Sequence, residues 1–245
     1  MQRRTLLAGG GTVLSALVAG CAADEIENID GGTRDNPSES DGEFLGSADL
    51  EIVDHEMVLD EEGYGTDVYV EATVENNGST PSGDVDLRVD WYDSDGNYLD
   101  NDTAQLTSLG DGERWVARVY NLLTDEADID DYELEGEFSE DAYEPTDELS
   151  LVGSSMNVVD EEFGDGELNV RGEVSNDSDA AQSYVEAVAK IYDDDGNVLG
   201  DDRTNITDLP GGETWAFTID YFSRDVDNRA GEAADHEILI KDSPW

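Results

Sequence analysis

The sequence repeats itself at a spacing of one hundred residues, and this repeat constrains the fold more than any other feature. Without a gap, the run Tyr92–Leu99 aligns with Tyr192–Leu199, and 16 of the 51 positions in 69–119 match those in 169–219. Such a match indicates two copies of one domain. Each copy has roughly one hundred residues, the size of an immunoglobulin-like sandwich. We expect the first domain at 48–149 and the second at 150–245.

Within each copy, apolar residues alternate with polar ones, which predicts β-strands with one buried face. The first copy shows the alternation at Val68, Val70, Ala72 and Val74, again at Val85, Leu87, Val89 and Trp91, and from Trp115 to Val119; the second shows it at Val185 to Ile191 and from Trp215 to Ile219. Asp95-Gly96 and Asp195-Gly196 predict two-residue hairpin turns with positive φ. No long amphipathic helix is evident. The predicted fold is all-β, with two immunoglobulin-like sandwiches in tandem.

The segments Val89-Asp90-Trp91-Tyr92-Asp93 and Ala189-Lys190-Ile191-Tyr192-Asp193 resemble the signature strand of the FxLYD domain family. In both copies an Asp-Gly turn follows, and then a loop that ends in Gly-Glu before an aromatic strand, as in that family. The family's Phe and Leu positions hold other apolar residues here. The resemblance implies an immunoglobulin-like module of exported proteins and supplies no catalytic residue.

The first twenty residues have the anatomy of a secretory signal. Arg3 and Arg4 precede an uncharged stretch from Thr5 to Ala19, which is shorter than the roughly 20 residues of a membrane span. The paired arginines resemble a twin-arginine export signal. Val18-Ala19-Gly20-Cys21 resembles a lipobox, which implies a lipidated cysteine at the mature N-terminus. The alternative is an ordinary signal with an incidental cysteine.

Cys21 is the only cysteine, so lipidation is its one evident use and no internal disulfide can form. One acyl chain binds membranes weakly, so we expect a two-chain lipid on Cys21. The residues up to 47 lack periodicity and are rich in Asp, Glu, Gly and Ser. We therefore predict that 21–47 is the lipidated cysteine with a flexible acidic tether.

The formal net charge of −51 arises from 63 acidic and 12 basic residues spread over the whole chain. The repulsion between these charges opposes a compact state in dilute buffer. In about 1 M salt the Debye length falls to roughly 3 Å, so the repulsion is largely screened. The composition, with the signal, resembles a haloarchaeal twin-arginine-exported lipoprotein. No basic patch exists that could serve as a nucleic-acid footprint, so nucleic acid is excluded as an expected partner.

No arrangement of residues suggests catalysis, and we expect no enzyme, no cofactor and no metal site. The Asp-Gly turns lack the spacing of a calcium loop, although a weak calcium site there is an open alternative. His55 and His236, the only histidines, lack zinc spacing. Trp115 and Trp215 fall on inward faces, so we interpret them as core residues rather than sugar platforms. We expect Tyr92 and Tyr192 to form local hydrogen bonds.

Four Asn-x-Ser/Thr sequons are candidate N-glycosylation sites, at strand ends or loops as the sequence predicts them: Asn77, Asn101, Asn176 and Asn205. The alternative is chance occurrence in a chain rich in Asn, Ser and Thr.

The leading hypothesis is a lipid-anchored surface protein on the outer face of the cytoplasmic membrane. It would act as a non-enzymatic interaction or structural module for an unknown envelope or extracellular protein. The alternative is an envelope binding lipoprotein for a small ligand, metal ion or glycan, which would need a cleft between the copies. An envelope enzyme is the third and weakest hypothesis.

Overall fold

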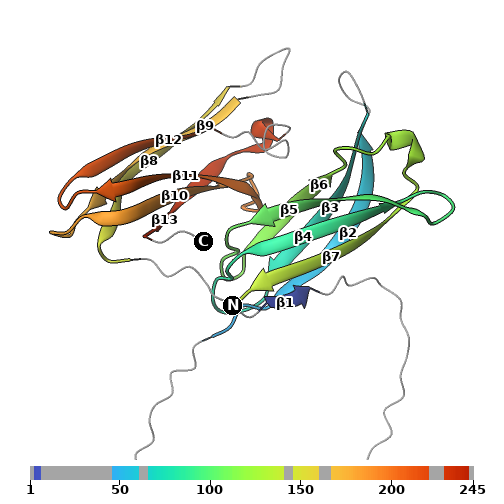
Figure 1. Cartoon of the computed structure of the whole chain (residues 1–245), viewed down its shortest axis with the longest axis horizontal. Helices are drawn as coiled ribbons and strands as arrows, with labels where there is room; N and C mark the ends of the chain where they lie inside the picture. The colour runs from blue at the N-terminus through green and yellow to red at the C-terminus, as the bar shows by residue number, and fades with distance from the viewer. Residues whose placement is uncertain are drawn as a thin grey trace, which may run out of the picture.

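The computed structural model describes residues 3–6, 46–60, 66–140, 146–159, 167–220 and 229–242. It confirms the all-β prediction: the described residues form two β-sandwiches (Figure 1). Apart from strands, they form only the short 3-10 segments η1 (Glu126–Asp128) and η2 (Ala230–Glu232). Within these described ranges, no helix has the length and apolar character needed to cross a bilayer.

The first sandwich packs two three-stranded antiparallel sheets. One sheet contains β2 (Leu50–Asp60), β3 (Asp67–Asn76) and β6 (Arg114–Tyr120), with β3 in the centre. The other contains β4 (Val85–Tyr92), β5 (Tyr98–Leu106) and β7 (Asp131–Ser139), with β4 in the centre. The period-two pattern explains this arrangement, since every second residue of β4 is buried and the others face outward.

The second sandwich has the same plan. Its sheets are β12-β9-β8 and β13-β10-β11, with these bounds: β8 (Leu149–Val159), β9 (Glu167–Asn176), β10 (Gln182–Tyr192), β11 (Val198–Leu209), β12 (Thr214–Asp220) and β13 (Asp235–Lys241). Leu149 packs into the second core, one residue before the predicted domain boundary. The domain limits themselves stay a prediction.

Each sandwich has its own hydrophobic core, and the two cores are filled differently. Trp91 fills the middle of the first core and is fully buried, and its Nε1 donates to Asp102 Oδ2 at 2.8 Å. The equivalent residue of the second core is the smaller Ile191. Trp115 is 1% exposed, which confirms it as a core residue, whereas Trp215 is only half-buried against Phe217.

The hairpin turns differ from the predicted two-residue type. Residue Asp95 does not have positive φ; only Gly96 does, at 76°, because the turn runs from Asp93 to Gly96. Asp93 Oδ1 accepts from the backbone N–H groups of Asp95 and Asn97, and this satisfaction favours the longer turn. The side chain and backbone of Asn97 hold the pKa of Asp93 below its usual range. The second copy has the same turn, with Gly196 at φ 82°.

A short strand, β1 (Arg3–Leu6), pairs antiparallel with β7 at the edge of the first sandwich. Arg3 lies opposite Ser139 and Arg4 opposite Phe138. The predicted signal segment therefore contributes an edge strand in the full-length chain. An unpaired β7 edge offers free backbone groups, which explains why an extended segment pairs there. The predicted role of Arg3 and Arg4 in export stays a prediction.

Candidate functional site: the junction of the two sandwiches

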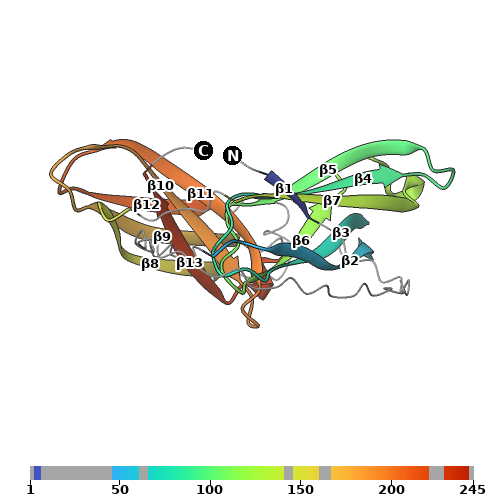
Figure 2. The ribbon, with the colours of Figure 1, turned by 90° about the horizontal axis from the view of Figure 1, so that it is seen from below.

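The two sandwiches are joined by a sheet that runs through both of them. Its strand order is β13-β10-β11-β6-β3-β2, and the join is a parallel pairing at which Val198 of β11 lies opposite Trp115 of β6. Seen from below, β6 and β11 meet where the sandwiches adjoin (Figure 2). Val198 is fully buried and belongs to the core of the first sandwich, not the second. The junction is therefore an extension of a hydrophobic core.

An ion pair between a buried lysine and a partly exposed glutamate lies at the junction. The Lys190 ammonium from β10 contacts Glu113 Oε2, and Lys190 is only 2% exposed. Glu113 Oε2 also accepts from the Gly110 backbone N–H at 2.6 Å, and its Oε1 accepts from the Tyr192 hydroxyl at 2.7 Å. Both carboxylate oxygens thus have partners: Oε2 has one from each sandwich, and Oε1 has one from the second sandwich. A buried charge is tolerated only when it is paired and hydrogen-bonded in this way.

The pKa values of these groups follow from their contacts. Burial pushes the pKa of Glu113 upward, but the Lys190 ammonium and the hydrogen bonds outweigh it and hold the pKa below its usual range. Burial, and then the Glu113 carboxylate, raise the pKa of the Tyr192 hydroxyl. Glu113 is therefore ionised and Tyr192 protonated at neutral pH, which is the combination that the contact requires.

An arginine cluster closes one side of the junction. Arg229, next to η2, is 3% exposed and its Nη1 donates to the Val116 carbonyl of β6 at 2.6 Å. Glu232 Oε2 accepts from Arg229 Nε at 3.1 Å, and its Oε1 lies 3.6 Å from Arg118 Nη2. Arg118 Nε also donates to Glu71 Oε2 at 2.9 Å. The Arg229 bond to Val116 and the Arg118–Glu232 contact cross between the copies, and the other two contacts hold these arginines in place within their own copies.

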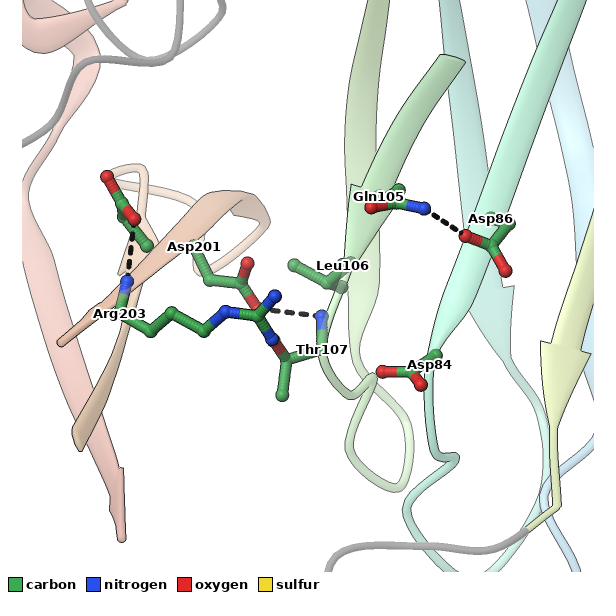
Figure 3. A pocket seen from close by; sticks show the side chains of 8 residues that line it. Asp84, Asp86, Gln105, Leu106, Thr107, Asp201 and Arg203 are labelled. Atoms are coloured by element: carbon green, nitrogen blue, oxygen red, sulfur yellow. Dashed lines mark hydrogen bonds between the residues drawn. The ribbon is translucent and has the colours of Figure 1, made fainter. Parts of the chain in front are cut away.

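A polar groove of about 320 Å³ lies at the junction, beside the Lys190–Glu113 pair. Its lining comes from both sandwiches: Asp84, Asp86, Gln105, Leu106, Thr107, Asp201, Asp202 and Arg203. Figure 3 shows that Asp201 and Arg203 face the strands of the first sandwich across the groove. The Thr107 backbone N–H donates to Asp201 Oδ2 at 2.7 Å, so the groove wall is itself a cross-domain contact.

The electrostatics of the groove are dominated by its aspartates. Burial raises the pKa of Asp201 to about 6, and the Thr107 hydrogen bond and the Lys190 charge oppose this shift only in part. Asp86 Oδ1 accepts from Gln105 Nε2 at 2.6 Å. Within the described ranges, no three His, Cys, Asp or Glu side chains are grouped so as to hold a metal ion. The groove can accept hydrogen-bond donors or a hydrated cation, but the structure shows no preassembled ligand set.

The structure tests the predicted glycosylation sites by their exposure. Asn77 and Asn205 are exposed, and Asn101 is half-buried with its Nδ2 donating to the Tyr98 hydroxyl at 2.6 Å. Asn101 and Asn205 lie inside β5 and β11, so the prediction of strand ends or loops is wrong for both. Asn176 is fully buried, so the folded chain does not present it to a transferase. Cys21 lies outside the described residues.

Asn176 and its counterpart Asn76 have a structural role that the glycosylation motif hid. The Nδ2 of Asn76 donates to the carbonyls of Thr80, Leu109 and Gly110, at 2.9 to 3.0 Å. Asn176 makes the equivalent bonds to Ala180 and Leu209, at 2.8 and 3.0 Å. Each asparagine therefore fixes two loops at one end of its sandwich. The sequence offered one sign of this structural role, because asparagine occupies the equivalent position, 76 or 176, in both copies.

The two histidines bridge the sheets of their own sandwiches in opposite directions. His55 Nδ1 on β2 lies 2.7 Å from the Tyr132 hydroxyl on β7. In the second copy His236 lies on β13, and its Nε2 is 2.9 Å from the Ser154 hydroxyl on β8. Strand pairing shows that Tyr132 and His236 occupy equivalent positions, opposite Trp91 and Ile191. Both copies therefore have a hydrogen bond between the same two strands of the repeat, but the histidine lies on one of these strands in the first copy and on the other in the second.

The tyrosines of the signature strand bond to other strands rather than locally. Tyr92 donates to Glu133 Oε2 on β7 at 2.9 Å. Tyr192 makes the equivalent contact with Glu237 at 2.9 Å and adds the bond to Glu113 across the junction. The same residue type therefore has a junction role in one copy only.

Comparison with known proteins assigns this chain to no family. No protein-family profile matches the chain, and no curated protein matches it. Among solved structures, a β-glucuronidase of glycoside hydrolase family 2 aligns at 14% identity with a TM-score of 0.26, covering 66% of this chain and 20% of that one. A calcium-binding mutant of Bacteroides uniformis β-glucuronidase 2 aligns at 16% identity with a TM-score of 0.25, covering 67% of this chain and 23% of that one. The chain spans about a fifth of these proteins, and such TM-scores carry no argument about activity.

Proposed function

We propose that this protein is a lipid-anchored cell-surface protein whose two sandwiches act together as a non-enzymatic interaction or structural module. The observation that carries the proposal is the junction, where Val198 enters the neighbouring core and the Lys190–Glu113 pair is buried. A buried, specifically bonded junction holds two domains in one orientation, whereas freely moving domains share small and wet contacts. Such a unit suits presentation of loops and strand edges to a partner.

The anchoring part of the proposal rests on the sequence around Cys21 and on the acidic stretch up to residue 47. Lipid on Cys21 would hold the first sandwich near the outer face of the cytoplasmic membrane. The test is fractionation of cells that express wild-type protein or Cys21→Ser. Wild-type protein is expected in the membrane fraction and the variant in the soluble fraction. Retention of the variant in the membrane fraction would contradict anchoring through Cys21.

The interaction role is tested by an affinity pull-down from native membranes in high salt. The control is a Lys190→Met variant, which keeps both sandwiches but breaks the ion pair that orients them. A partner retained by wild-type protein and lost by the variant supports a module that needs both sandwiches. Capture of no protein by either form would contradict the interaction role.

The second candidate is binding of a small ligand or cation, and the groove of about 320 Å³ at the junction favours it. Its aspartates attract a cation, and oxygen-rich walls can coordinate calcium irregularly. Calorimetric titration with calcium in high-salt buffer tests this candidate, with Asp201→Asn as the matched variant. Heat that is present in the wild type and absent in the variant supports it. A flat titration of the wild type ends it for calcium.

A further inference from the structure

The junction is a head-to-tail contact, because the two sandwiches contribute different surfaces of the same repeat. The first contributes the end of the sandwich at which β6 starts, and the second contributes the end at which β10 finishes and β11 begins. A contact of this kind leaves one unused copy of each surface. The unused accepting surface is the end of the second sandwich at which β12 starts. We call Gly212, Glu213, Thr214 and Trp215 the tip.

The tip has the same backbone as the surface that is occupied in the first sandwich. The Asn176 N–H donates to the Glu213 carbonyl at 3.0 Å, as the Asn76 N–H donates to the Glu113 carbonyl at 3.0 Å. Gly212 has φ of 74° and its counterpart Gly112 has φ of 70°. The backbone of the accepting loop is therefore also formed in the second sandwich, where Pro210 lacks the N–H with which Gly110 holds the Glu113 carboxylate.

The side chains of the tip differ from their counterparts in exposure. Glu213 is exposed, whereas Glu113 has partners for both carboxylate oxygens. Trp215 is half-buried, whereas Trp115 is 1% exposed and lies opposite Val198 in the strand pairing. The tip thus presents a carboxylate beside a partly exposed indole, the combination that the first sandwich uses to hold the second.

We propose that the tip docks a β-sandwich domain of another protein, through a lysine or arginine that pairs with Glu213 and an apolar residue that covers Trp215. The proposal rests on the proposed function as an interaction module and names the class of partner. The internal junction is its template: there the cation is Lys190 and the apolar residue is Val198. Continuity of the β6 edge with β11 shows that such an edge accepts a strand.

A second copy of this chain does not fit the tip. Its first sandwich has Asp90 where the second has Lys190, and Tyr98 where the second has Val198. Docking would bring the Asp90 carboxylate against Glu213, and like charges that meet in an interface are repelled. Asp90 therefore blocks self-assembly of the chain into head-to-tail filaments, and the cation must come from a different protein.

The test uses a probe made from this chain, with Asp90→Lys, Tyr98→Val and Glu213→Lys, in a Cys21→Ser background for solubility. Its first sandwich offers the missing cation, and its own tip cannot accept a cation. Wild-type protein, also with Cys21→Ser, is titrated with the probe in about 1 M salt, which screens the long-range repulsion but spares a partly buried pair. The expected results are a doubling of mass by light scattering and a shift of the Trp215 Nε1–H resonance.

The matched control replaces the wild-type acceptor by Glu213→Lys, for which neither change is expected. If wild type and probe stay separate at the highest soluble concentration and the Trp215 resonance does not move, the proposal is overturned. A Glu213-dependent dimer of wild-type protein alone would also overturn it, since the partner would then be a second copy. In the membrane pull-down, a partner held equally by wild type and Glu213→Lys would refute the tip while leaving the interaction role standing.

Discussion

The same end of the repeat is buried in the first sandwich and exposed in the second. In the first, Glu113 is paired with Lys190 of the neighbouring copy and Trp115 is 1% exposed, while in the second Glu213 is exposed and Trp215 is half-buried. Gly112, Glu113 and Trp115 recur as Gly212, Glu213 and Trp215, so these residues do not decide which copy docks. The copies differ on both surfaces of the junction. On this surface Gly110 and Arg118 correspond to Pro210 and Thr218, and on the opposite surface Lys190, Val198 and Asp201 correspond to Asp90, Tyr98 and Asn101. Divergence at a few positions has turned a duplicated domain into an ordered pair.

The largest expected effect comes from removing the cation of the junction. Lys190→Met leaves the Glu113 carboxylate without its counter-ion, and breaking a buried pair costs about 3 kcal/mol of unfolding free energy. The variant should also unfold in two separate transitions, because the sandwiches lose their coupling. Denaturant unfolding at high salt, followed by tryptophan fluorescence, measures both. The matched control is Asp90→Met, which removes a surface ion pair with Arg88 and is expected to cost less than about 1 kcal/mol.

The double variant Glu113→Gln with Lys190→Met separates pairing from packing. It removes both charges, so it should recover most of the loss. Equal stability loss in the single and double variants would show that the ion pair does not couple the copies.

The buried asparagines give the next largest effect, and here the copies should behave alike. Asn76→Ala removes the side-chain hydrogen bonds to the carbonyls of Thr80, Leu109 and Gly110, which costs about 2 kcal/mol. Asn176→Ala removes the equivalent bonds and should cost a similar amount. Thermal unfolding of the two variants side by side tests the equivalence. A loss confined to one copy would mean that the shared asparagine does different work in each.

Asp201 gives a smaller, pH-dependent effect. Its pKa is raised to about 6 in the folded chain, above about 3.9 when unfolded, so its contribution to stability is present at low pH and lost as the pH rises from about 4 to about 6. Asp201→Asn copies the residue of the first sandwich and removes the buried charge. Two pKa units correspond to about 3 kcal/mol, and because Asp201 is only half-buried, solvent screening should leave about half of this. The variant should then be about 1.5 kcal/mol more stable than wild type at pH 7 and equal near pH 4. A stability difference that does not change with pH would contradict the assignment.

The smallest effect compares the signature tyrosines. Tyr192→Phe removes a hydroxyl that bonds to Glu113 across the junction and should cost about 1 kcal/mol. Tyr92→Phe removes an exposed bond to Glu133 and should leave the free energy of unfolding nearly unchanged. Chemical unfolding of both variants measures the difference. Equal losses of unfolding free energy in the two variants would contradict a junction role for the Tyr192 hydroxyl.

The sequence predicted the sandwiches because period-two alternation follows directly from burial of one sheet face. Trp115 and its neighbours show this plainly, as every second residue of β6 is buried. The junction could not be predicted in this way. Lys190 alternates with Ala189 and Ile191, so the same pattern places it on the solvent side, and only the neighbouring sandwich buries it. Docking of two domains is a long-range contact that local periodicity does not encode.

The turn and the histidines show two further limits of pattern reading. The Asp-Gly pair suggested a two-residue turn, but the Asp93 carboxylate satisfies two backbone N–H groups and favours a longer one. His55 and His236 looked unrelated, because the contact that they share has its partners exchanged between strands. Sequence alignment compares single positions, whereas this hydrogen bond is preserved as a pair.

The central claim, that the junction holds the sandwiches as one unit, is tested most directly by a distance measurement between them. Spin labels on Ser94→Cys, in the far turn of the first sandwich, and Thr214→Cys, at the tip, would report it in a Cys21→Ser background by pulsed electron paramagnetic resonance. We predict one narrow distance distribution for this protein and a broad one after Lys190→Met is added. A broad distribution that Lys190→Met leaves unchanged would contradict the account.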